Sequence, residues 1–155
     1  MPDPKIHPDV TEALKALPQF AGHYSLPVPE ADNHEYGAAV AGLGQERIRF
    51  RVGKLTPTKV GLFVAVWRRA QGGSTEPFPS DDGTDLLVVT VREGTKAGHF
   101  AFPVSALLKH GIVSVKGAGG KRGFRVYPPW SDVSNPQALR TQQWQCAFYT
   151  DHAPV

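Results

Sequence analysis

Residues 46–54 alternate between basic and large apolar side chains, and this pattern constrains the fold more than any other feature of the chain. One face of the extended segment carries arginine at positions 47, 49 and 51, and the other carries Ile48, Phe50 and Val52. Alternation with a period of two is typical of a β-strand with one apolar face. The chain therefore contains a sheet whose apolar face needs a covering layer.

The remaining pattern predicts an α+β fold. Further strands are expected over 36–43, 60–67, 85–92, 99–102, 112–115 and 122–127. Helices are expected over 9–16, where Asp9 and Glu12 have the spacing of a capping box, over 103–108, and after Asn135-Pro136. In the last helix, one face carries Leu139, Gln143, Cys146 and Ala147, and the helix is predicted to dock on the sheet. We expect a single mixed, curved β-sheet flanked by N- and C-terminal helices.

The length of 155 residues suits a single domain. We divide it into an acidic N-terminal helix and loop over 1–34, with the loop at 18–33, and a core over 35–150. The lone Cys146 cannot form an internal disulfide, and the N-terminus lacks the basic and apolar regions of a secretory signal. We expect a cytoplasmic protein without a membrane segment.

Charge is distributed unevenly along the chain. Residues 1–46 hold seven acids and two bases, so the rest of the chain holds 15 bases and seven acids. Two stretches, 47–75 and 94–131, contain bases but no acid. If the fold gathers these bases on one side, their field attracts a polyanion; a scattered, solvated surface is the alternative, and charge alone does not decide between them.

Several bases in these stretches are candidate phosphate ligands. Lys54 falls on the apolar face if the alternation from residue 48 continues, so it must be paired or lie at a cleft mouth. If Gly53 ends the strand, Lys54 instead turns to water. Thr56, Thr58 and Lys59 follow, and they are either phosphate donors or ordinary turn residues.

A glycine-rich segment over 117–123 carries Lys121 and Arg122, but it lacks the Walker pattern. It is either a basic loop around a phosphodiester backbone or a hairpin. After it, Arg125, Tyr127 and Trp130 interleave a cation with aromatic rings, which could bind phosphate and stack bases or could cover a core.

Catalysis by metal ions at a phosphodiester needs converging carboxylates and often a lysine. Glu35, Asp85 and Lys54 could form such a set if their strands are adjacent. The histidines show no metal-ligand spacing, so no resident metal is predicted, and Mg²⁺ or Mn²⁺ is needed only for this nuclease alternative.

Several motifs together resemble the MepB-like family of small bacterial proteins. They are Glu35-Tyr36, Arg51-x-x-Lys54, Thr56-Pro57-Thr58-Lys59, Arg125-Val126-Tyr127-Pro128-Pro129-Trp130 and Thr141-Gln142-x-Trp144-Gln145. The resemblance implies a restriction-endonuclease-like fold of the PD-(D/E)XK group and binding of DNA or RNA. The nuclease motif has an acid two residues before its lysine, where this chain has Val52, and this departure argues for binding without cleavage.

We therefore expect a non-catalytic nucleic-acid-binding protein on a nuclease-like scaffold. Its predicted ligands are Arg51, Lys54, Thr56, Thr58, Lys59, Lys121, Arg122, Arg125, Tyr127, Trp130 and Gln142. One alternative is a metal-dependent nuclease using Glu35, Asp85 and Lys54. Another is a module for a small anion or a protein partner, with Arg51, Lys54 and Gln142 lining a cleft.

Overall fold

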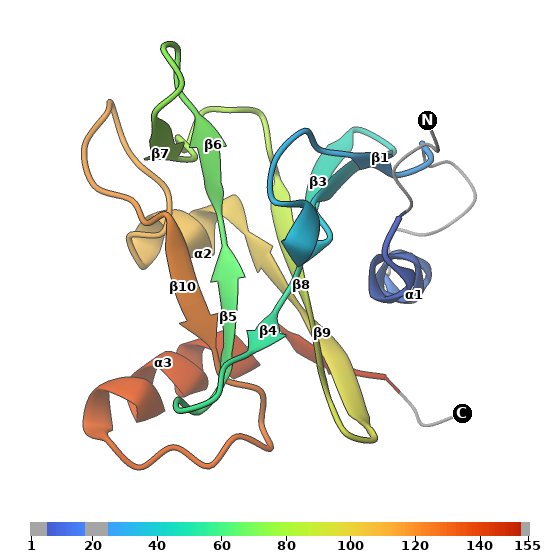
Figure 1. Cartoon of the computed structure of the whole chain (residues 1–155), viewed down its shortest axis with the longest axis vertical. Helices are drawn as coiled ribbons and strands as arrows, with labels where there is room; N and C mark the ends of the chain where they lie inside the picture. Colours follow the sequence, from blue (N-terminus) through green and yellow to red (C-terminus); the bar gives the residue numbers. More distant parts are fainter. Residues whose placement is uncertain (1–5, 18–24, 153–155) are drawn as a thin grey trace.

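The computed structural model describes residues 6–17 and 25–152, and its largest element is a six-stranded mixed sheet (Figure 1). The strand order is β1-β2-β3-β8-β9-β11, in which β3 and β8 pair in parallel and the other neighbours are antiparallel. The strands are β1 Val28–Pro29, β2 Ala39–Leu43, β3 Glu46–Val52, β8 Leu86–Glu93, β9 Lys96–Pro103 and β11 Tyr149–Asp151. The mixed sheet confirms the α+β prediction.

A three-stranded antiparallel sheet and a two-stranded ribbon accompany the large sheet. The first has the order β10-β5-β4 and the second pairs β6 with β7. Their strands are β4 Lys54–Leu55, β5 Leu62–Ala65, β6 Trp67–Arg69, β7 Thr75–Pro77 and β10 Gly123–Val126. The expectation of a single sheet is therefore wrong.

Gly53 is the point at which the chain leaves the large sheet. A β-carbon at this position would lie 3.1 Å from the Leu62 β-carbon and 3.3 Å from the Thr90 carbonyl oxygen, so glycine allows the two sheets to approach closely here. β3 ends before Gly53, and β4 begins after it in the second sheet. The alternation of β3 therefore does not extend to Lys54, and the interpretation in which Gly53 ends the strand is correct.

Two apolar clusters cover the two faces of the large sheet. On one face, helix α1 (Pro8–Ala16) packs Val10 and Leu14 against Ile48 and Phe50. On the other face, a second cluster contains Val89 and Phe100 of the large sheet, Val64 and Val126 of the second sheet, and Leu107 of α2 (Val104–Lys109). Figure 1 shows the same layering, with α1 and the β5–β10 pair on opposite sides of β3 and β8.

Helix α3 (Pro136–Cys146) lies beside β10 and β9. Asn135 caps it as predicted, because its Oδ1 accepts a hydrogen bond from the Ala138 N–H at 2.8 Å. Its docking face differs from the prediction in part, since Cys146 packs against the core as expected and Ala138 and Gln145 are buried, whereas Leu139 is exposed.

The other predicted elements shift by small amounts. Helix α1 begins one residue early, with His7 as its cap and Pro8 at the first helical position, a position that suits proline. Residues 112–115 form isolated bridges, at Ser114 and Val115, in place of a strand. Residues 18–24 of the expected loop at 18–33 lie outside the described residues. Among the described segments, no helix is both long and apolar enough to cross a membrane.

Candidate functional site

A groove of about 410 Å³ runs between β10 and α3, and we call it the α3 groove. Strand β10 contributes Phe124 and Arg125, and α3 contributes Gln137, Thr141 and Trp144. His110, at the C-terminal end of α2, lines the groove together with Lys121 and Tyr127. In this described lining there is no Asp or Glu, so the groove is cationic.

The floor of the groove is held by one buried amide. Gln145 has no exposed surface, and its Oε1 accepts from the Tyr127 N–H while its Nε2 donates to the Arg125 carbonyl, both at 2.8 Å. These two backbone groups lie along the edge of β10 that faces away from β5, where no other described strand pairs with it. The Gln145 amide thus takes the place of a neighbouring strand and fixes the backbone that carries Arg125 and Tyr127.

Arg125 connects the groove to the segment 56–61. Its guanidinium donates to the Thr56 hydroxyl at 2.6 Å and to the carbonyls of Val60 and Gly61 at 3.2 and 3.4 Å. The Tyr127 ring lies against Gly61, which has φ +85°, and a β-carbon there would lie 2.7 Å from the ring. The segment therefore needs glycine at this position and is held by Arg125.

Two further hollows continue the α3 groove. One of about 310 Å³ shares Arg125 and Tyr127 with the groove and adds Lys59, and the next, of about 660 Å³, reaches Thr56, Thr58 and Trp130. Asp132 lines both hollows, and Glu93 lines the second. The positive charge is therefore least compensated in the α3 groove itself.

The structure brings seven of the predicted phosphate ligands to this continuous surface. They are Thr56, Thr58, Lys59, Lys121, Arg125, Tyr127 and Trp130. Lys59 and Lys121 are exposed, and neither forms an ion pair with any residue in the described ranges. Both side chains are therefore available to contact an incoming phosphate.

Arg51 is a correction to the sequence-based prediction, because its side chain has no exposed surface. The guanidinium pairs with the Glu30 carboxylate at 2.6 Å and donates to the carbonyls of Phe50 and Ala65. Arg49 bonds the same carboxylate at 2.8 Å, and burial lowers the pKa of Arg51 despite the Glu30 partner. Arg51 joins the two sheets and cannot contact phosphate or line a cleft for an anion.

The predicted catalytic set of Glu35, Asp85 and Lys54 is not assembled. Glu35 lies in a single 3₁₀ turn, η1 (His34–Tyr36), in place of a strand, and its carboxylate is 3.7 Å from Lys54 Nζ. Asp85 accepts from the Arg47 N–H at 2.8 Å, at the start of β3, whereas Lys54 follows the end of that strand. At about 3.3 Å per residue these ends are about 20 Å apart, so Asp85 cannot share a metal ion with Glu35.

Structural partners engage two further predicted ligands, Gln142 and Arg122, and also Trp130 of the seven residues above. Gln142 donates to the carbonyls of Pro128 and Ser131 at 2.9 and 3.0 Å, so it positions the turn after β10 instead of offering its amide to phosphate. Arg122 donates to the Thr75 carbonyl at 2.9 Å and does not line the groove. The Trp130 indole donates to Glu93 at 3.0 Å and its ring packs on the core, as the core-covering interpretation predicted.

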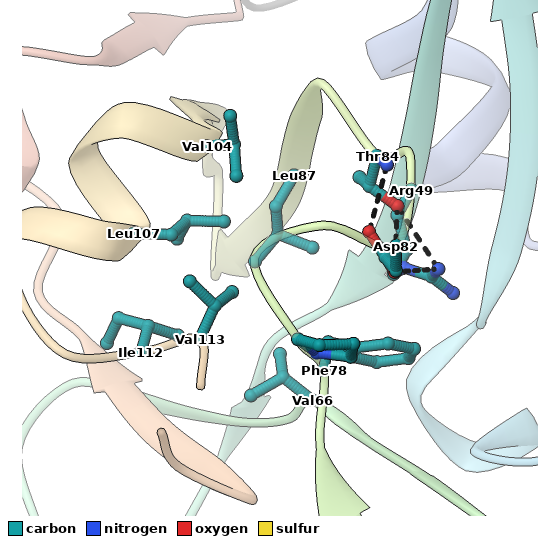
Figure 2. Close-up of a pocket in the computed structure, with 11 residues that line it drawn as sticks. Arg49, Val66, Phe78, Asp82, Thr84, Leu87, Val104, Leu107, Ile112 and Val113 are labelled. Carbon is teal, nitrogen blue, oxygen red and sulfur yellow. Dashed lines mark hydrogen bonds and ion pairs between the residues drawn. The ribbon is translucent and has the colours of Figure 1, made fainter. Parts of the chain in front are cut away.

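A smaller hollow, drawn in Figure 2, has a volume of about 30 Å³. Its walls are apolar, with Leu87, Leu107 and Val113 among them, and the hydrogen-bonded Arg49 and Asp82 lie at one end. This volume holds one or two water molecules. The cavity is therefore too small to be a ligand site.

Sequence reasoning missed the contributions of the helices to the groove. His110, Gln137, Thr141 and Trp144 all line it. A signal for two of them existed, because Thr141 and Trp144 lie in one of the strings that carry the family resemblance. Neither His110 nor Gln137 belongs to such a string.

The chain resembles known proteins in both sequence and fold. The MepB-like family model matches residues 30–151, and the chain belongs to this family. A solved structure described as the crystal structure of MepB is similar, with 29% sequence identity and a TM-score of 0.82 over 94% of this chain and 98% of that chain. A search of curated proteins found no match.

Proposed function

We propose that this protein binds nucleic acid through the α3 groove and the adjoining segment 56–61, without cleaving it. The observation that carries this proposal is the clustering of Lys59, Lys121 and Arg125 with aromatic side chains on one continuous, hollowed surface. Cations that neutralise phosphates beside rings that stack on bases are the combination used by proteins that bind single strands or loops.

The structure's geometry favours binding over cleavage. The nuclease alternative needs Glu35, Asp85 and Lys54 together, and they lie at opposite ends of β3. Lys54 is also paired with Glu35 and lies 4.8 Å from the centre of the Tyr36 ring. The restriction-endonuclease-like relation of the large sheet and a cytoplasmic location remain predictions and belong to the same proposal.

The test is a titration of labelled DNA and RNA oligonucleotides, followed by fluorescence anisotropy across a range of salt. The logarithm of the affinity should fall linearly with the logarithm of the salt concentration, and Lys121→Ala should reduce the slope by about 1. Lys15→Ala is the matched control, since Lys15 is an exposed base on α1, across the large sheet from the groove.

Cleavage is tested on the same samples. With Mg²⁺ or Mn²⁺ added, the strands should remain intact on a denaturing gel. Cleavage that disappears in Glu35→Ala would establish the nuclease alternative. Binding of a small anion such as phosphate, with none of any oligonucleotide at low salt, would favour the small-ligand alternative instead.

A further inference from the structure

The α3 groove has the volume of a binding site for a small molecule or for one monomer of a polymer. Its volume of about 410 Å³ lies within the range of about 300–1,000 Å³ that is usual for pockets that bind small molecules. The double helix is a wide, stiff object whose bases are stacked and paired. It cannot place a base face inside a hollow of this size.

One wall of the groove is a pair of stacked rings. The His110 imidazole lies parallel to the Trp144 indole, with the ring centres 3.8 Å apart and an angle of 7° between the planes. Trp144 in turn packs against Phe102 of the core, at 5.4 Å between ring centres. Burial and the neighbouring Lys109 both lower the pKa of His110. The stacking on Trp144, and the packing of Trp144 on the core, give the groove a fixed aromatic wall.

Polar groups line the groove beside this wall. Gln137 is exposed in α3 and carries an amide that can donate to and accept from a base edge, and Thr141 lies one turn further along the helix. Lys121 and Arg125 supply charge in the same lining. Gln145 fixes the floor, so little ordering is required when a ligand enters.

We propose that the α3 groove accommodates one unpaired nucleotide of a single strand, with the base against the His110–Trp144 wall and the adjacent phosphate at Lys121 and Arg125. This inference rests on the proposed function and specifies its ligand. The segment 56–61, which contains Lys59, then contacts the nucleic-acid strand where it leaves the groove. The protein discriminates single strands from duplexes because only an unpaired base presents its face to this wall.

The experiment compares a labelled single-stranded oligonucleotide, its duplex, and the same strand with abasic sites, at one fixed salt concentration. The single strand should bind at least fivefold more tightly than either of the others, which is the lower end of the range expected for one stacked base. A nucleoside monophosphate should compete weakly, because it lacks the contacts to Lys59.

A pair of variants on α3 localises the effect. Gln137→Glu places a negative charge in the groove, whereas Gln143→Glu makes the same change at an exposed position outside the lining. Gln137→Glu should weaken single-strand binding at least fivefold and Gln143→Glu less than twofold. Far-UV circular dichroism and melting temperatures verify that both variants fold.

The outcomes separate the two proposals. Equal affinity for single strand and duplex, or for intact and abasic strands, would overturn the single-nucleotide inference and leave nucleic-acid binding standing. Monophosphate binding as tight as that of the oligonucleotide would also overturn it, in favour of a small-molecule site. Loss of binding to every oligonucleotide, at low salt and with the wild-type chain, would refute the proposed function itself.

Discussion

At the scale of single residues, Arg51 shows how a basic side chain can serve the interior instead of the surface. Its charge is buried beside Glu30, and the arrangement holds β3 against the end of β5 through the Ala65 carbonyl. A buried charge without its partner is costly, so Glu30→Met should lower the free energy of unfolding by about 3–5 kcal/mol. The double variant Glu30→Met with Arg51→Met should lose less than the two single variants added together. Urea denaturation measures all three, and a loss below about 1 kcal/mol in Glu30→Met would contradict this account.

His99 makes the second prediction at this scale. It is buried, and its Nδ1 lies 2.8 Å from His152 Nε2. Burial, and to a smaller extent His152, lower the pKa of His99 to about 4. The imidazole of the unfolded chain takes up a proton near pH 6.5, whereas that of the folded chain does so only near pH 4. The contribution of His99 to the free energy of unfolding is therefore complete above about pH 6.5 and falls by about 3 kcal/mol as the pH is lowered to about 4.

Unfolding followed at several pH values checks this dependence. The charged groups that face the pair belong to α1, β8 and β11. They are Asp9 and Glu12 of α1, Arg92 of β8 and Asp151 of β11, and each interacts electrostatically with His152. His99→Gln should flatten the stability profile between pH 4 and 6.5, whereas His34→Gln, at an exposed histidine, should leave it unchanged. A wild-type profile that is already flat in this window would show that His99 takes up its proton in the folded state.

At the scale of elements, α3 and the edge of β10 depend on one side chain. Gln145→Leu removes the partners of the Tyr127 N–H and the Arg125 carbonyl, and each buried group left unpaired costs about 1–3 kcal/mol. We expect a loss of about 2–4 kcal/mol in unfolding free energy. Gln143→Leu, on the exposed side of the same helix, should change it by less than about 0.5 kcal/mol. Equal effects of the two variants would show that the amide does not support the strand.

The same helix shows how far sequence reasoning reaches at this scale. Its start at Asn135 and the strand β3 were predictable, because caps and alternation act between near neighbours. The docking face of α3 was not, since an apolar pattern selects Leu139 and cannot anticipate a glutamine that serves as a strand partner. Strands β1, β7 and β11 were also missed, because two or three residues leave no periodic pattern.

At the scale of the whole molecule, the bases of the two acid-free stretches differ in whether they form ion pairs. The acids of the first 46 residues neutralise bases of the first acid-free stretch: Glu30 pairs with Arg49 and Arg51, and Asp32 pairs with Arg69. In the second acid-free stretch, 94–131, no base forms an ion pair with any residue the structure describes. Counting bases along the sequence therefore overestimated the first stretch as a source of phosphate ligands.

The distinction between free and paired bases gives a prediction for two variants with the same loss of charge. The first double variant, Lys59→Gln with Lys121→Gln, removes an unpaired base from the α3 groove and another from the adjoining hollow. The second, Lys54→Gln with Arg69→Gln, removes two bases that pair with Glu35 and Asp32. The salt dependence of oligonucleotide affinity should lose about two units of slope in the first variant and almost none in the second. Equal losses would mean that net charge, and not the groove, attracts the nucleic acid. A larger loss in the second variant would place the binding surface beside η1 and β4, on the side where Lys54 contacts Tyr36.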